Sequence, residues 1–277
     1  ACSRTARAAA TSSSISVIGG TSLARAACAR RPPDASGGAA ARRGLHAAPR
    51  PAILARMCGR FVITHPDEAL ARLFDARPAN DLPEGPRYNV CPTQPIATVR
   101  SEGGTRRLAP MRWGFLPHWY KTPTDGPLLI NARAETVATK PAFRTACRER
   151  RCLVPATGFY EWTKDDAGNR LPWYIPRADG APLAFAAIWQ DWARGAESHR
   201  TVAIVTAEAR ADMATLHHRC PVVLEPDDWA KWLGEAGHGA ATLMTAPAEG
   251  TLVWHRVDPQ VNSNRAEGPD LIAPLAA

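Results

Sequence analysis

A succession of short apolar runs, each bounded by turn residues, dominates the central part of this chain. Runs of this length are typical of β-strands, and their number indicates a sheet-rich domain rather than a bundle of helices. The runs are Ile96–Arg100, Leu128–Asn131, Cys152–Pro155, Trp173–Pro176, Leu183–Trp189, Thr201–Thr206 and Val222–Leu224.

Three segments read as helices that flank these strands. Thr64 can cap a helix whose first turn holds two acidic residues, and apolar residues at helical spacing follow. The segments 208–216 and 227–233 are predicted as further helices, the second opened by Pro226 and ended by Gly234. Strands and helices together predict one compact α+β domain with a β-rich core.

The first 57 residues differ in composition from the rest. They hold nine Arg, no Lys and one acidic residue, Asp34, whereas residues 58–277 hold 25 basic and 25 acidic residues. This Ala-, Ser-, Gly-, Pro- and Arg-rich segment lacks helical or strand periodicity, so we expect residues 1–57 to be a disordered extension ahead of a domain at 58–277. Such composition fits an organelle transit peptide in residues 1–56 or a mis-assigned start ahead of Met57, and we favour the second.

Composition also limits the partners of the folded part. No stretch approaches the ~18 apolar residues of a membrane span, so we expect no membrane partner. Because residues 58–277 carry no net charge, binding to nucleic acid requires a local groove. The chain has seven cysteines but no CxxC pair, which favours free thiols and a cytoplasmic location.

Cys58 follows Met57, and cleavage between them would expose a thiol and an α-amine on one residue. The reference pKa values are about 8 for the amine and about 8.5 for the thiol, so both groups are partly deprotonated near neutral pH. The amine can form a Schiff base with an aldehyde, and the thiol can then close a five-membered ring on the same carbon. A buried structural cysteine is the alternative, and Met57–Cys58 alone favours it.

Three polar residues lie next to apolar or aromatic residues in two further segments. Asn131 and Arg133 follow an apolar run, as residues presented into a cleft would, although a turn Asn beside a solvated Arg fits as well. Glu161 lies between Tyr160 and Trp162, where desolvation would suit a general acid or base. The alternative for Glu161 is an edge-strand residue that faces water.

The segment from His217 to Cys220 joins a predicted helix to an apolar strand. A His here could transfer protons, and Arg219 could hold a phosphate. We predict no metal site, because neither HxxxH nor CxxC spacing occurs and adjacent residues rarely reach one ion. Trp113 and Trp119, if exposed, could stack on unpaired bases, although most of the nine tryptophans must belong to the core.

Taken together, these segments resemble the SOS response-associated peptidase (SRAP) family, over about residues 57–277. The matching motifs occur in the family's order. They are Met57–Phe61, Arg87–Val90 with Pro92, Trp113–Gly114 with Pro117 and Trp119, Ile130–Arg133 with Glu135, Gly158–Trp162, and His217 with Arg219 and Pro221. The resemblance implies an α+β fold whose core is a mixed sheet or barrel-like, with flanking helices and a groove for single-stranded DNA.

The resemblance also implies roles for individual residues. In the family, an N-terminal Cys crosslinks to the ring-opened aldehyde of an abasic site as a thiazolidine. Carried over, Cys58 is the nucleophile, Asn131 positions the N-terminus and the sugar, Glu161 shuttles protons and His217 assists Schiff-base chemistry. The DNA-binding residues would be Arg60, Arg133 and Arg219 at phosphates and Asn89, Trp113, Trp119 and Thr206 in the groove. No cofactor is implied.

Two departures from the family's pattern lie next to His217: Cys220 stands where Met is usual, and His218 where Asn or Asp is common. The extension is a third, because an amide-linked Cys58 cannot form a Schiff base. The family's name implies autoproteolysis that would remove residues 1–57. We therefore expect a monomeric, nucleoid-associated enzyme acting on single-stranded DNA with abasic sites. A thiol peptidase using Cys58 and His217, or a non-catalytic reader of modified bases, remains an alternative.

Overall fold

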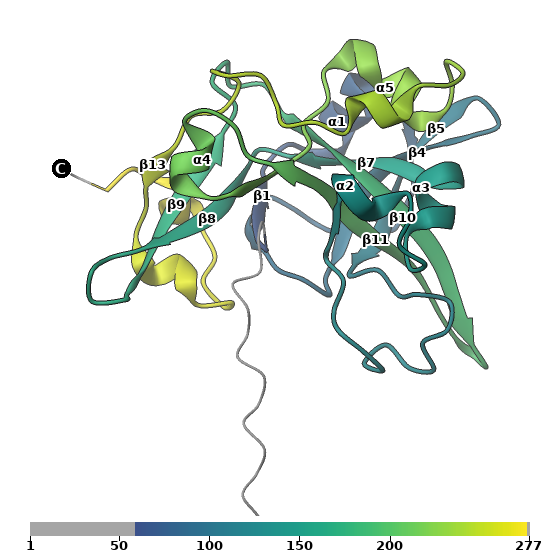
Figure 1. The fold of residues 1–277 in the computed structure, drawn as a ribbon, viewed down its shortest axis with the longest axis horizontal. Coiled ribbons are helices and arrows are strands. Elements are labelled where there is room, and N and C mark those ends of the chain that lie inside the picture. Colours follow the sequence, from purple (N-terminus) through teal and green to yellow (C-terminus); the bar gives the residue numbers. More distant parts are fainter. Residues whose placement is uncertain (1–58, 276–277) are drawn as a thin grey trace, which may run out of the picture. The chain divides into compact units, whose positions relative to one another are not determined.

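The structure, a computed structural model, describes residues 59–275 (Figure 1). The expected disorder of residues 1–57, the domain boundary that follows them and the nucleophile Cys58 lie outside the described residues.

Five long strands close into a ring. They are β4 (Pro95–Glu102), β5 (Thr105–Trp113), β7 (Arg151–Ala156), β10 (Leu183–Arg194) and β11 (Glu197–Glu208). Neighbours pair antiparallel from β5 through β4, β7 and β10 to β11, and a parallel pairing of β11 with β5 closes the circle. Three short strands extend this sheet: β2 (Ala76–Pro78) beside β5, and β6 (Asn131–Arg133) and β12 (Arg219–Pro221) beside β11. The expected barrel-like, β-rich core is confirmed.

A second, five-stranded sheet packs against one face of the ring strands. Its order is β13 (His255–Arg256), β9 (Arg170–Pro176), β8 (Gly158–Lys164), β1 (Phe61–Ile63) and β3 (Arg87–Val90). The short strand β1 lies in its interior, antiparallel to both β3 and β8.

Alternation along the ring strands divides the core into two clusters. In β11, Val202 and Ile204 join the first cluster, whereas Ala203 and Val205 join the second. The first cluster also takes Phe61 and Phe159 from the second sheet, so it fills the space between the two sheets. The second cluster is completed by helix side chains such as Trp232. The period of two therefore assigns one face of each ring strand to the sheet and the other to the helices.

Four helices pack with the second cluster, and Figure 1 shows them around the ring strands: α1 (Asp67–Leu73), α2 (Ala134–Val137), α3 (Arg144–Glu149) and α5 (Pro226–Leu233). The short helix α4 (Met213–Leu216) instead lies near β8. Three 3₁₀ turns, at Ala240–Leu243, Pro259–Asn262 and Pro269–Ile272, occur in the C-terminal part. Across residues 59–275, no helix combines the length and the apolar character needed to cross a membrane.

Most predicted elements are confirmed, with some departures. The helix after Thr64 begins at Asp67 without a side-chain cap, and the run Leu128–Asn131 joins a regular strand only at Asn131. Helix 227–233 exists as α5, and Gly234 ends it in the left-handed conformation at φ 83°. The predicted helix 208–216 is helical only from Met213, because β11 continues to Glu208, where it pairs with Arg219 of β12. The run Val222–Leu224 is not a regular strand; its one ladder contact is the bridge from Val223 to Phe185.

Every cysteine in the described part of the chain is a buried free thiol: Cys91, Cys147, Cys152 and Cys220. Burial raises the pKa of each thiol above its ordinary value, and the pKa of Cys220 reaches about 11. These four side chains are therefore protonated, uncharged parts of the interior at neutral pH.

Trp232 offers a test of the packing between α5 and the ring. Its side chain is fully buried, and its indole N–H donates to the carbonyl oxygen of Cys152 at 2.8 Å. We expect Trp232→Phe to lower the free energy of unfolding by about 2 kcal/mol, because it removes this bond and leaves a cavity. The measurement is urea unfolding followed by circular dichroism.

The same substitution at an exposed position is the control. Trp119 is 45% exposed, so Trp119→Phe should change the free energy of unfolding by less than about 0.5 kcal/mol. Equal losses for the two variants would contradict this account of the core.

Candidate functional site

The first described residues lie against strand β8, which carries Glu161. Phe61 pairs with Phe159 and Val62 with Gly158, and the N–H of Tyr160 donates to the carbonyl oxygen of Arg60 at 3.0 Å. Continuing this antiparallel register places Gly59 opposite Glu161. The described chain therefore starts beside this carboxyl group.

Glu161 faces the interior rather than water. Strand alternation places its side chain on the same face as Phe159, toward the first cluster, and only 3% of the residue is exposed. Trp173 is its direct neighbour across the β8–β9 ladder. Because β8 lies between β1 and β9, the alternative of an edge-strand Glu in solvent is excluded.

Asn131 opens strand β6 and faces the same space between the two sheets. It is paired with Ile204 of β11, and paired residues present their side chains on one face. Two hydrogen bonds fix the residue before it. The indole N–H of Trp113 and the N–H of Ile204 both donate to the carbonyl oxygen of Ile130, at 3.1 Å and 3.0 Å. Asn131 therefore belongs to a strand rather than to a turn.

His217 follows α4 in an extended conformation, with φ −155° and ψ 142°. Its Nδ1 lies 3.1 Å from the backbone nitrogen and 3.0 Å from the carbonyl oxygen of Arg219. The N–H can donate to a neutral ring, and the carbonyl can accept from a protonated one. The main chain of one residue thus provides a contact for Nδ1 in either protonation state.

Glu161 of β8 and His217, in the turn between α4 and β12, are brought together, with Oε1 and Nδ1 3.9 Å apart. Burial lowers the pKa of His217, and the nearby His218 and Arg219 lower it further, whereas the hydrogen bond to the Arg219 carbonyl opposes them. The ring of His218 lies 4.4 Å from that of His217. A mainly neutral imidazole beside a buried carboxyl can accept, hold and return a proton.

Arg219 and Thr206 lie next to this pair but are engaged with protein groups. Arg219 is 7% exposed, and its guanidinium donates two hydrogen bonds to the carboxylate of Glu135, at 2.6 Å and 3.0 Å. It also donates to the carbonyl and hydroxyl oxygens of Thr206, at 2.5 Å and 3.3 Å. Thr206 is fully buried.

Arg60 and Asn89 fasten the C-terminal segment to the second sheet. The guanidinium of Arg60 donates to the carbonyls of Val261 and Asn262 and to Asn264, and it lies over the ring of Trp162. The amide of Asn89 donates to the carbonyls of Ser263 and Ala266, both at 2.9 Å. In this structure both side chains serve the fold.

The remaining predicted DNA-binding residues divide by exposure. Trp113 is fully buried and supports the strand of Asn131, as described above. Trp119 lies 45% exposed in the loop between β5 and β6, and Arg133 is exposed at the end of β6. No ion pair of Arg133 occurs among residues 59–275, so its cation is available to a ligand in this part of the chain.

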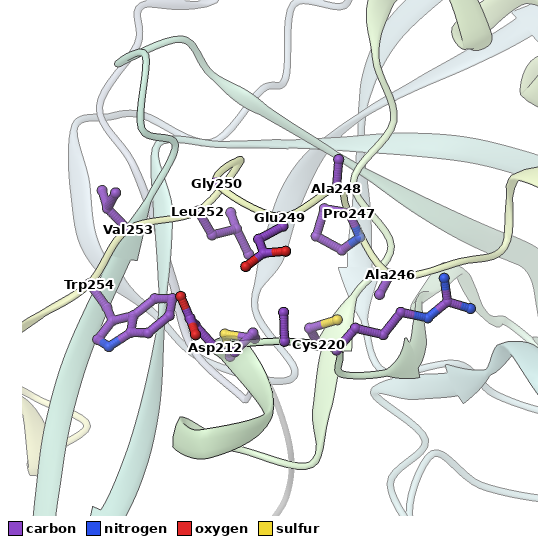
Figure 2. A pocket seen from close by; sticks show the side chains of 13 residues that line it. Asp212, Cys220, Ala246, Pro247, Ala248, Glu249, Gly250, Leu252, Val253 and Trp254 are labelled. Carbon is purple, nitrogen blue, oxygen red and sulfur yellow. The ribbon is translucent and has the colours of Figure 1, made fainter.

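A cavity of about 550 Å³ is lined by residues 210–213, Cys220 and residues of the segment 246–254 (Figure 2). Met213 and Cys220 line it, and the carbonyl of Met213 accepts the N–H of His217 at 3.0 Å. Trp254 forms another wall, and Figure 2 shows the Glu249 carboxylate pointing into the space. Neither Glu161 nor His217 lines this cavity, so it is a separate feature from the pair.

Sequence reasoning missed the ion pair of Glu135, although this residue was part of the motif that includes Asn131. Its signal was weak, since an acid in a first helical turn is usually solvated.

Over the described ranges, no group of three or more His, Cys, Asp or Glu side chains is arranged to hold a metal ion.

Comparison with known proteins gives matches over most of the chain. The family model described as SOS response associated peptidase (SRAP) matches residues 57–264. The abasic site processing protein YoaM of Bacillus subtilis is 37% identical over 64% of this chain and 79% of its own. The abasic site processing protein YedK of Escherichia coli is 33% identical over 79% of this chain and all of its own. The mouse protein of that description, HMCES, is 28% identical over 79% of this chain and 76% of its own.

Solved structures show the same fold. A crystal structure of a Bacteroides thetaiotaomicron protein aligns with a TM-score of 0.69 at 22% identity, covering 79% of this chain and all of that one. A phage-related protein of Bordetella bronchiseptica aligns with a TM-score of 0.58 at 32% identity, covering 72% and 94%.

The lowered pKa of His217 predicts a pH dependence of stability. In the folded state this side chain binds a proton less readily than in the unfolded chain, whose histidines have a pKa of about 6.5. As the pH falls through that value, the unfolded state takes up more protons and the free energy of unfolding decreases. We expect His217→Gln to lose less stability than the wild type between pH 7.5 and 5.5, measured by urea unfolding. Parallel profiles for the two proteins would contradict the assignment.

Proposed function

The chain belongs to the SOS response associated peptidase (SRAP) family, and from this premise we propose that it processes abasic sites in single-stranded DNA by capturing the lesion covalently through Cys58. The names of the relatives YoaM, YedK and HMCES, each an abasic site processing protein, support the substrate.

One observation carries the proposal: the Glu161–His217 pair lies where β1 begins. Continuing the β1–β8 register places Gly59 opposite Glu161, and Cys58 is the residue before Gly59 in the sequence, so we propose that Cys58 acts beside this pair. A proton-transferring pair and an aminothiol would then share one site. Asn131, facing the same interior space, is proposed to orient the amine and the sugar.

The proposed reaction needs the amine and thiol of Cys58, the aldehyde of the abasic sugar and groups that transfer protons. The amine of Cys58 attacks the aldehyde carbon of the ring-opened abasic sugar, and the resulting carbinolamine loses water to give a Schiff base. The thiolate then attacks the imine carbon, and the nitrogen takes up a proton to complete a thiazolidine. We propose that Glu161 and His217 carry the protons for ring opening, dehydration and ring closure.

This chemistry requires a free α-amine. While Cys58 is joined to Met57 its nitrogen is an amide, which cannot form a Schiff base. We therefore propose that residues 1–57 are absent from the active protein, either removed, in part by autoproteolysis, or never made.

DNA binding is proposed to depend on local contacts, because residues 58–277 carry no net charge. Arg133, exposed and without an ion pair in the described part, is the strongest candidate for a phosphate contact, and exposed Trp119 for stacking on a base. Arg60 and Arg219 would have to share their guanidinium groups between protein oxygens and a phosphate. Asn89, Trp113 and Thr206 are proposed to shape the groove from within, since all three are buried.

A crosslinking assay tests the function. Protein that begins at Cys58 should form a band that survives denaturation when mixed with an abasic single-stranded oligonucleotide. The full chain, with an amide at Cys58, should give none. Cys58→Ser should abolish the band, because a hydroxyl cannot replace the thiol in the stable ring.

Several results would overturn the proposal. They are a missing band for the protein that begins at Cys58, a band unaffected by Cys58→Ser, or a native active species whose intact mass includes residues 1–57. Cleavage of a peptide in trans would instead favour a thiol peptidase. Reversible binding that survives loss of Cys58 would favour a reader of modified bases.

The phosphate contact of Arg133 has its own signature in salt dependence. Losing one phosphate contact should reduce the slope of log affinity against log salt by about 0.7 for a single strand. We expect this change for Arg133→Gln, measured by fluorescence anisotropy with a single-stranded oligonucleotide. Arg72→Gln, an exposed arginine on α1, is the control and should leave the slope unchanged. Equal slopes for wild type and Arg133→Gln would remove this contact from the proposed groove.

A further inference from the structure

Glu135 joins two segments of the candidate site. It lies in the first turn of α2, directly after the strand that carries Asn131 and Arg133. Its carboxylate accepts both guanidinium N–H groups of Arg219, at 2.6 Å and 3.0 Å, and the N–H of Glu208 at 3.3 Å. The side chain therefore bridges α2, the end of β11 and the beginning of β12.

Arg219 continues this chain of contacts to His217. Its side chain is 8% exposed and is held between the Glu135 carboxylate and the oxygens of Thr206. Its main-chain N–H and carbonyl are the groups that face Nδ1 of His217, at 3.1 Å and 3.0 Å. Whatever fixes the guanidinium thus also fixes the peptide groups that orient the imidazole.

The Glu135 carboxylate is the negative charge that holds the Arg219 guanidinium in this buried position. A guanidinium so far removed from water is costly unless a negative charge pairs with it, and breaking such a pair from one side leaves that cost uncompensated. The hydrogen bond from Arg219 holds the pKa of Glu135 below its ordinary value, so the pair stays charged at neutral pH. β12 is only three residues long and starts at Arg219, so the pair holds the first residue of a short ladder, next to the turn that carries His217.

We propose that Glu135 is a positioning residue for the reaction: acting through Arg219, it keeps Nδ1 of His217 on the main chain and leaves Nε2 as the ring nitrogen that exchanges protons with the reactants. The role of Glu135 in the reaction rests on the proposed function. The contacts that link Glu135, Arg219 and His217 do not depend on it. Glu135 itself touches neither the lesion nor the reacting atoms.

Histidine NMR of the full 277-residue chain tests the geometry directly. Wild-type His217 should show mainly the tautomer protonated on Nδ1, whose proton the Arg219 carbonyl accepts and which leaves Nε2 free to take up a proton. Glu135→Gln should introduce the other tautomer and move the titration midpoint of His217 by about 0.5 pH unit or more. Within residues 59–275, the charged or titratable groups that face this ring are Glu161, His218 and Arg219, and of these three Arg219 is the one that contacts Glu135.

Single-turnover crosslinking of an abasic oligonucleotide, with protein that begins at Cys58, tests the consequence. Glu135→Gln should lower the crosslinking rate constant about tenfold at saturating DNA, because a small displacement of a proton-transferring group is costly to rate. Glu135→Asp, which retains the charge, should recover part of the loss. Glu235→Gln breaks the ion pair to Arg106, 2.8 Å long and likewise partly exposed, and should match the wild type.

The outcomes separate this inference from the proposed function. An unchanged tautomer and titration midpoint of His217 in Glu135→Gln would overturn the positioning role, even in a protein that crosslinks DNA. An unchanged rate constant would do the same. The wild-type protein could fail to crosslink although Glu135→Gln changes the tautomer and titration midpoint of His217. That result would overturn the proposed function but not the positioning of His217 by Glu135. Should Glu135→Gln not fold, Arg219→Lys replaces it, with the same expected changes.

Discussion

The register of strand β1 is the constraint on which the site depends. Phe61 is fully buried and packs edge-on against the rings of Trp113 and Phe185, with centroids 5.2 Å and 6.3 Å away. A slip of one residue would turn this ring to the other face of the sheet and move Gly59 away from Glu161. A strand of three residues therefore sets which described residue lies opposite Glu161.

The site is an edge of the core where polar side chains replace apolar ones. Along the facing surfaces of the two sheets, Phe159 and Ile204 belong to the shared cluster, and Glu161 and Thr206 follow them at the next inward position. The turn from β11 through α4 to β12 then adds His217. The same alternation that builds the core thus directs Glu161 inward, the turn brings His217 to it, and burial lowers the pKa of His217.

The sequence was sufficient for the fold class and for most of the strands, because apolar runs between turn residues are local signals. It was insufficient for β5, where three arginines and Pro110 interrupt the pattern and where pairing with β4, β2 and β11 decides the structure. It also mistook 208–212 for helix, since the pairing of Glu208 with Arg219 joins residues that are distant in sequence. The resemblance indicated Glu161 and His217 as site residues, but only the structure shows them 3.9 Å apart and Arg219 held by Glu135.

The burial of four cysteines affects how readily the protein reacts with oxidants. Peroxides and soft electrophiles react with thiolates, and raised pKa values together with burial keep Cys91, Cys147, Cys152 and Cys220 from supplying any. These four thiols should therefore react slowly with such oxidants and electrophiles.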